Sequence, residues 1–427
     1  MREIELKGLN ETIYEHITKE GLRVYMWPND KVNSAYYSLS VKYGSIHTKF
    51  KIGRKTYEVP NGLAHFLEHV KFNYDKNTTA HDLFYKMGAD ANAFTTFNYT
   101  SYVVFTTSKK TEVLNTLLDF VYKPYFTARM ISKEKGIIVE EANMGSDDAY
   151  SDCYYHSLQN IFQKSKYRNL ITGDPREIKS INLDDIKLVF DTFYHPQNMF
   201  LCITGNINPY EMAKVIDDNL SKKEFTEYKN PKIINEEEPK SVNKKYDEYY
   251  TNLTYPRIKY AIKLPISKFK NIDLVDLRIM TNLILNINFG ETSIFKEELM
   301  EKELITGMYY NTDIYDDYFV ITVTASTNYY EEVIKKIEEK FKNLELTKEE
   351  LIRKRNALMA TMILNFEDIE VVNSSLQDDI MLEDRIIDDV KLRLKNYKLS
   401  DLEKIMNLIK LDNVSVNVFL PNKNPEE

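Results

Sequence analysis

The same order of predicted elements occurs twice along this chain of 427 residues. In the first half, residues 99–108 have the composition of a β-strand, an amphipathic helix follows, and a second helix is predicted at 132–144, with Ser132 as a possible N-cap. The second half repeats this order, with a strand at 316–326 and a later helix at 347–362. Each half then closes with a helix, a turn and a strand. We interpret the chain as two diverged copies of one α+β unit.

A polar segment separates the two halves. Residues 222–245 are rich in Lys, Glu, Asn and Pro and have no sustained apolar period, which is typical of a linker. We therefore predict one domain at 1–221, a linker at 222–246 and a second domain at 247–427. Because strands precede helices and read as hairpins, each domain should be a mostly antiparallel sheet with helices packed on one side.

Composition argues against several classes of function. The 57 basic and 65 acidic residues give a net charge of -8, which argues against nucleic acid as the main partner. The two cysteines, Cys153 and Cys202, are too few for a disulfide framework or a Cys-rich zinc site, and they favour a reducing compartment. The N-terminus has no apolar signal core, and no stretch approaches 18 apolar residues. We expect a soluble, cytoplasmic protein with no membrane partner.

One short stretch carries groups that can do chemistry. In "PNGLAHFLEHVKFN" (residues 60–73), His65, Glu68 and His69 lie within an apolar segment that predicts a buried helix. Residues four apart share a helix face, so the imidazoles of His65 and His69 could bind one zinc ion, and Glu68 could act as general base on a bound water. The alternative is a chance match, since a lone histidine on a helix is more often a packing or surface residue. We favour the zinc site, because burying three ionisable groups without a partner is expensive.

A catalytic zinc ion takes three protein ligands and leaves one position open, so a third ligand must lie elsewhere. Glu134 and Glu141 are seven residues apart and share a face of the predicted helix, whereas Glu140 is turned from Glu141 by about 100°. One glutamate of such a pair could bind the metal while the other orients an imidazole. His195 precedes a proline at a turn, which favours a structural role for it. Spacing alone does not decide among the candidates, which include His81, His195, Glu134, Glu140, Glu141, Asp147 and Asp148.

Three stretches together resemble a known family: "AHFLEHVKF", "GADANAFTTFNYTSYVVF" and "EKGIIVEEANM". They are similar to the pitrilysin, insulinase and mitochondrial-processing-peptidase family, zinc peptidases with the inverted His-x-x-Glu-His motif. The resemblance covers both halves and is strong through residue 206. It implies a zinc metalloendopeptidase in which His65, His69 and Glu141 bind one zinc ion. It further implies Glu68 as the catalytic base and Glu134 as the carboxylate that orients an imidazole.

The resemblance also implies how substrate binds. The segment formed by Asn92, Ala93, Phe94 and Thr95 matches the family's edge strand, which binds extended peptide through main-chain hydrogen bonds. The zinc would lie in domain 1–221, whereas domain 247–427 lacks the motif, and the two would form half of a clamshell chamber. Glu68 would take a proton from the zinc-bound water and pass it to the leaving amine.

The second half departs from the family pattern. Members that complete an active site within one chain carry an Arg and a Tyr seven residues apart, and here those positions are Met300 and Gly307. We therefore predict a heterodimer with a homologous subunit that supplies the Arg and the Tyr, as in bacterial two-subunit members. Alternatively, Tyr309 or Tyr310 substitutes for the missing Tyr in a monomer or homodimer. A third interpretation is a non-catalytic subunit that binds peptide or serves as a scaffold.

Overall fold

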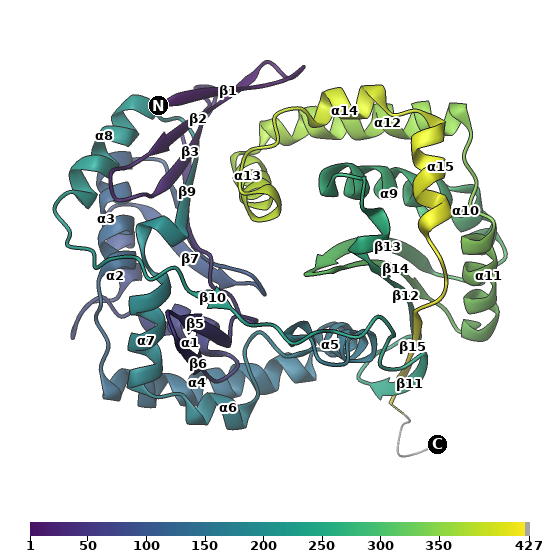
Figure 1. Ribbon diagram of the computed structural model, residues 1–427, viewed down its shortest axis with the longest axis horizontal. Coiled ribbons are helices and arrows are strands. Elements are labelled where there is room, and N and C mark those ends of the chain that lie inside the picture. The colour runs from purple at the N-terminus through teal and green to yellow at the C-terminus, as the bar shows by residue number, and fades with distance from the viewer. Residues whose placement is uncertain (423–427) are drawn as a thin grey trace. The chain divides into compact units, whose positions relative to one another are not determined.

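The computed structural model describes residues 1–422, apart from the side chains of residues 146 and 147. It forms two compact units, each built from segments of both halves of the sequence (Figure 1). Unit 1 comprises Met1–Asn143, Asn169–Asn235 and Ile363–Asp389. Unit 2 comprises Met144–Arg168, Glu236–Met362 and Val390–Glu427.

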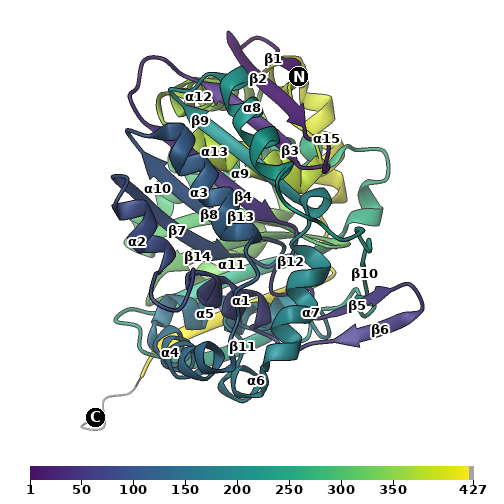
Figure 2. The ribbon, with the colours of Figure 1, turned by 90° about the vertical axis from the view of Figure 1, so that its left-hand side faces the viewer.

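Unit 1 contains a seven-stranded sheet with the order β1-β2-β3-β9-β4-β8-β7 (Figure 2). Its strands are β1 (Arg2–Leu6), β2 (Glu11–Ile17), β3 (Arg23–Pro28), β4 (Ala35–Val41), β7 (Ala89–Thr95), β8 (Thr100–Thr106) and β9 (Met199–Gly205). Neighbouring strands are antiparallel except β3 and β9, which are parallel. A smaller sheet pairs β5 (Lys49–Ile52) with β6 (Lys55–Glu58) and with β10 (Lys232–Ile233).

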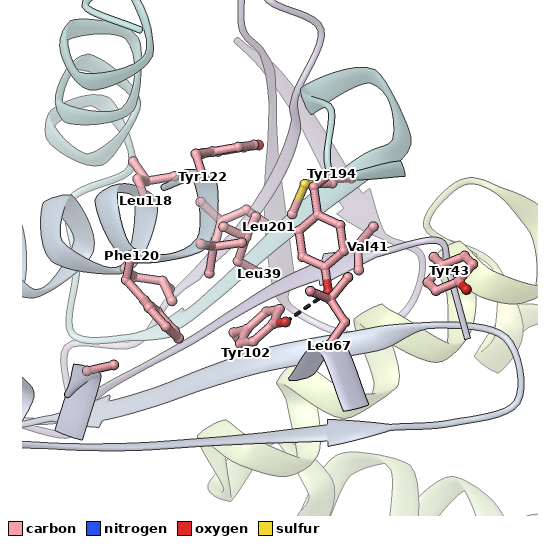
Figure 3. Close-up of a cluster of buried hydrophobic side chains, with 14 of the residues drawn as sticks. Leu39, Val41, Tyr43, Leu67, Tyr102, Leu118, Phe120, Tyr122, Tyr194 and Leu201 are labelled. Carbon is pink, nitrogen blue, oxygen red and sulfur yellow. Dashed lines mark hydrogen bonds between the residues drawn. The ribbon is translucent and has the colours of Figure 1, made fainter. Parts of the chain in front are cut away.

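One face of the larger sheet packs on the main core of unit 1. The helices of this unit are α1 (Leu63–Lys71), α2 (Ala80–Tyr85), α3 (Lys110–Tyr122), α6 (Pro175–Ser180), α7 (Leu183–Phe193), α8 (Pro209–Leu220), α13 (Ile369–Glu383) and most of α4 (Ala128–Asp147). Leu39 of β4 and Leu67 of α1 are fully buried in the same cluster, close to Tyr102 and Tyr194 (Figure 3). The two tyrosine hydroxyls hydrogen-bond to each other at 2.8 Å.

The other face of this sheet is covered by α13, which packs on it through an apolar cluster and through buried polar contacts. Ser38 donates a hydrogen bond to Asn373 at 2.5 Å, and Ser40 donates to Gln377 at 3.1 Å. The Asn373 amide in turn donates to the backbone carbonyl of Cys202 at 3.2 Å. The sequence predicts helices on one side, and the structure adds this helix on the second side. Serines that alternate with apolar residues along a strand indicate a solvent-exposed face of the sheet, so the sequence does not reveal that α13 covers it.

Unit 2 repeats the strand order of unit 1. Its five-stranded sheet has the order β11-β15-β12-β14-β13, and only β11 and β15 are parallel. The strands are β11 (Tyr246–Thr251), β12 (Arg257–Pro265), β13 (Gly307–Tyr315), β14 (Tyr318–Ser326) and β15 (Val414–Pro421). The run β3-β9-β4-β8-β7 of unit 1 has the same order and the same directions. The predicted repeat and the mostly antiparallel sheets are therefore confirmed.

The helices of unit 2 also follow the pattern of unit 1. They are α5 (Ala149–Ile161), α9 (Leu274–Phe289), α10 (Ile294–Glu301), α11 (Tyr330–Lys342), α14 (Val390–Asn396), α15 (Leu399–Leu408) and most of α12 (Lys348–Leu364). The first of them, α5, contacts β11 and β15 through apolar and polar groups, as α13 contacts the sheet of unit 1. Thr251 donates to Asp152 at 2.6 Å, and Asn160 donates to Asn417 at 2.6 Å. Each unit thus holds one such helix from the other half of the sequence.

The polar segment at 222–246 makes specific contacts. Its strand β10 pairs with β5, and Glu238 accepts hydrogen bonds from the backbone N–H groups of residues 163–165 at 2.7 to 2.9 Å. Glu238 also accepts a hydrogen bond from Lys263 at 2.6 Å. The domain boundaries given above stay a prediction, and the compact units do not follow them residue for residue.

Local boundaries differ from the prediction at one helix. The helix expected at 132–144 begins earlier, at Ala128, so Ser132 lies inside α4 and is not its cap. The hydroxyl of Thr127 accepts a hydrogen bond from the N–H of Met130 instead. Among the described residues, no helix combines the length and the apolarity needed to cross a membrane.

Candidate metal centre

The helix α1 is fixed in place by an apolar stripe and by a glycine at its N-terminus. Leu63, Phe66, Leu67 and Val70 are all buried in the core of unit 1. Gly62 caps the helix with φ of 82°, and a Cβ there would lie 2.3 Å from the carbonyl oxygen of Thr172. Glycine is therefore required at this position, both for the backbone angle and for the close approach.

Two histidines of α1 and one glutamate of α4 converge. The Nε2 atom of His65 lies 3.4 Å from one carboxylate oxygen of Glu141, and the Nε2 atom of His69 lies 3.3 Å from the other. The candidate ligand atoms of these three residues all lie within 4.8 Å of one another. Two imidazoles and a carboxylate are the donor set of several catalytic zinc sites.

The spacing of these atoms can be compared with the size of a zinc ion. Tetrahedral zinc bound at about 2.0–2.2 Å separates neighbouring ligand atoms by roughly 3.3–3.6 Å. The separations of 3.4 and 3.3 Å, each from an imidazole to a different oxygen of Glu141, lie within this range. The Nδ1 atom of His69 lies 3.9 Å from a carboxylate oxygen of the buried Glu134, on the side of the ring away from Glu141. The residues present therefore fit a zinc ion.

Charge also favours a cation at this position. The hydrogen bond with His65 lowers the pKa of Glu141, although burial acts in the opposite direction. Burial alone would lower the pKa of His69, but Glu134 and Glu141 raise it, and the net direction is upward. Glu68, Glu134 and Glu141 bring three carboxyl groups to two imidazoles, an arrangement that a bound cation would stabilise.

Glu68 is buried on α1 between the two histidines in sequence. Burial raises the pKa of its carboxyl group, while His65, Thr95 and His69 act in the opposite direction. The hydroxyl of Thr95 donates a hydrogen bond to the Oε2 atom of Glu68 at 2.5 Å. Sequence reasoning gave Thr95 a role in peptide binding and missed this contact. The alternation along β7 could have indicated it, because Ala91, Ala93 and Thr95 share the inward face.

Three of the other candidate ligands predicted from the sequence lie elsewhere. Glu140 is exposed on α4, one residue from Glu141. His195 accepts a hydrogen bond from the N–H of Gln197 at 3.2 Å, which is a turn contact. Asp148 caps α5 and accepts from the N–H of Ser151 at 2.8 Å.

Of the last two candidates, His81 does not belong to the cluster. The ring of His81 stacks on Phe72 at 4.5 Å and lies 5.9 Å from the ring of Tyr85. The side chain of Asp147 lies outside the part of the chain that the structure describes.

The predicted peptide-binding segment forms the end of an edge strand. Residues 92–95 belong to β7, which pairs with β8 at the end of the sheet order. The side chains of Asn92 and Phe94 are exposed, whereas those of Ala93 and Thr95 are half-buried. An edge strand presents unpaired N–H and C=O groups to which an extended peptide can pair.

Comparison with known proteins gives the family. Residues 24–174 match the family model described as insulinase (peptidase family M16), and residues 180–358 match the model of the peptidase M16 inactive domain. The zinc protease YmfH of Bacillus subtilis (strain 168), named as uncharacterized, is 36% identical over 309 residues, which cover 71% of this chain and 72% of YmfH.

Solved structures agree with this relationship. An M16-like peptidase from Alicyclobacillus acidocaldarius matches with a TM-score of 0.91 and 25% identity, over 98% of this chain and 100% of the other. Pitrilysin matches in fold with a TM-score of 0.77 and 14% identity, over 99% of this chain and 47% of pitrilysin. The fold and the relatives define a class of peptidases built from repeated α+β units. Within that class, the chain belongs to the M16 insulinase family.

Proposed function

We propose that this chain is the zinc-binding subunit of a metalloendopeptidase. The observation that carries the proposal is the convergence of His65, His69 and Glu141 within 4.8 Å, beside the buried carboxyl group of Glu68. The comparisons support the coarser statement of a peptidase-like function, since relatives such as YmfH are named zinc proteases.

The residues can be given roles in amide hydrolysis. His65, His69 and Glu141 would hold the zinc ion, with Glu134 orienting the ring of His69 from 3.9 Å. When bound, zinc would polarise the scissile carbonyl and lower the pKa of its water. Glu68 would accept a proton from the attacking water and later donate it to the nitrogen of the leaving amine. Asn92 to Thr95 on β7 would hold the peptide by main-chain hydrogen bonds.

The proposal includes a partner chain. Met300 is an exposed residue of α10, and Gly307 opens β13, so neither supplies the guanidinium or the phenol expected at these positions. The chain corresponds to 47% of pitrilysin, which supports pairing with a second chain of similar length. We infer a heterodimer with a homologous subunit that carries the Arg and the Tyr. Free Cys153 and Cys202 agree with a reducing compartment, and we assign the protein to the cytoplasm.

An active site completed within one chain is the second candidate, and one contact favours Tyr309 for it. Tyr309 is exposed on β13, and its ring centroid lies 5.9 Å from the guanidinium carbon of Arg257. Tyr310 is half-buried, and its hydroxyl donates to the carbonyl of Asn282 at 3.4 Å. Tyr309 is therefore the better placed of the two to contact a substrate.

The test compares the purified chain with and without a homologous Arg- and Tyr-bearing chain from the same organism. Adding that chain should raise kcat/KM on an unstructured peptide by about 100-fold or more, because oxyanion donors are worth that much. Full activity of the chain alone would contradict the heterodimer. In that case, unchanged activity after Tyr309→Phe together with Tyr310→Phe would exclude the substitution of either tyrosine for the missing Tyr.

A further inference from the structure

A threonine at the end of the edge strand contacts the proposed catalytic base. Thr95 is the last residue of β7, and its Oγ1 atom lies 2.5 Å from the Oε2 atom of Glu68 on α1. Among the described residues, this hydroxyl is the group that hydrogen-bonds to the Glu68 side chain. The contact joins two elements that are separated by 27 residues in the sequence.

The direction of this hydrogen bond follows from the neighbouring groups. Thr95 also lies 3.3 Å from the hydroxyl of Thr100, but Thr100 donates its own proton to the carbonyl of Tyr43 at 3.0 Å. A hydroxyl has one proton to donate, and an ionised carboxylate can only accept. The proton of Thr95 is therefore committed to Glu68, whose Oε1 atom is left for other partners.

The backbone around Thr95 is held firmly. Thr95 pairs with Thr100 in the last register position of the β7–β8 ladder. The next residue, Thr96, closes a turn with Tyr99. The N–H of Thr96 donates to the carbonyl of Tyr99 at 2.8 Å, and the N–H of Tyr99 donates to the Thr96 hydroxyl at 3.0 Å. A β-branched side chain on such a strand has few rotamers, so the hydroxyl position is well defined.

We propose that Thr95 is a positioning residue that fixes the carboxylate of Glu68 and ties it to the edge strand β7. This inference rests on the proposed peptidase function and adds a role that differs from peptide binding. A carboxylate held at one oxygen keeps its orientation toward the reacting water, and a displacement of about 1 Å can cost about 100-fold in rate. Thr95 thereby links the strand that would bind peptide to the group that would move the proton.

The first test is Thr95→Val, which removes the hydroxyl and keeps the shape and the β-branching. It is made in the active form of the enzyme, with the homologous partner present if the wild type needs it. We expect kcat to fall by about 10- to 100-fold, KM to change by less than about two-fold, and the zinc content to stay as in the wild type. Thr95→Ser, which keeps the hydroxyl, should recover most of kcat.

A matched control separates this effect from damage to the sheet. Thr106 on β8 is also buried, and its hydroxyl donates to the carbonyl of Ser108 at 2.7 Å, away from Glu68. Thr106→Val should leave the kcat of the folded enzyme unchanged. An equal loss in both valine variants, or no rescue by Thr95→Ser, would overturn the proposal.

A binding measurement does not depend on activity. In a Glu68→Gln background, Thr95→Val should change the dissociation constant of a fluorescent unstructured peptide by less than about two-fold. Weaker binding by about 10-fold or more would assign Thr95 to peptide binding and overturn the positioning role. An inactive, zinc-free wild type with its partner present would instead contradict the proposed function, so the two failures are distinguishable.

Discussion

Replacing Glu68 by Gln is expected to lower kcat by about 10²- to 10⁴-fold, the usual contribution of a general base. Glutamine has nearly the shape of glutamate but cannot accept the proton of the attacking water. Glu68 is buried on α1 and lies between the two histidines in sequence. The substitution requires no change in the packing of the helix. The effect should appear in kcat, because the peptide would be held by the backbone of β7.

The measurement combines steady-state kinetics with zinc analysis of the same sample. The Glu68→Gln variant should contain as much zinc as the wild type, since Glu68 is outside the group formed by His65, His69 and Glu141. Retention of more than about a tenth of the wild-type kcat would contradict the role of Glu68 as base. A parallel loss of zinc would mean that Glu68 serves the metal site instead.

Replacing Glu238 by Ala is expected to lower the free energy of unfolding by about 3–5 kcal/mol. The side chain of its partner Lys263 is 0% exposed and that of Glu238 is 7% exposed, so the variant would leave a buried ammonium without its counter-charge. Three backbone N–H groups at residues 163–165 would also lose their acceptor. The carbonyl groups of Pro239 and Ser241, at 2.8 and 3.2 Å from the Lys263 ammonium, would remain.

Urea unfolding followed by circular dichroism measures this effect. The control is Glu237→Ala, because Glu237 is the exposed neighbour and its loss should cost less than about 0.5 kcal/mol. Combining Glu238→Ala with Lys263→Met should recover much of the stability, since no buried charge is then left unpaired. Equal stability of Glu238→Ala and Glu237→Ala would contradict the account.

The ion pair between Glu238 and Lys263 also makes the stability of the folded chain depend on pH. Burial would raise the pKa of Glu238, but Lys263 and the backbone N–H groups outweigh it, so the pKa is lowered in the folded chain. Stabilisation from this group is complete above the unfolded value of about 4.3 and is lost as the pH falls through the lower folded value.

The sequence predicted which candidate site residues share a helix face. His65 and His69 are four residues apart on one helix, and the spacing of seven between Glu134 and Glu141 put both on one face of another. The resemblance to a family, and not the spacing, selected Glu141. The repeat was predictable because apolar periodicity marks each core-facing strand and helix.

The contacts that the sequence did not reveal are polar and join distant segments. Ser38 and Ser40 on β4 indicate a solvent-exposed face of the sheet. Asn373 alone does not indicate which sheet α13 covers. Glu238 lies in a segment with linker composition, although it pairs with a lysine 25 residues away. Hydrophobic periodicity predicts what is buried against the core, but it carries no signal for polar pairs between such segments.

The zinc content of two neighbouring variants tests the central claim most directly. Glu141 contributes its carboxylate to the cluster with His65 and His69, whereas Glu140 is the next residue of the same helix and is exposed. Glu140→Gln should bind about one zinc ion per chain, as the wild type should, and Glu141→Gln should bind well below one. Stoichiometric zinc in Glu141→Gln, or an equal loss in Glu140→Gln, would contradict the account.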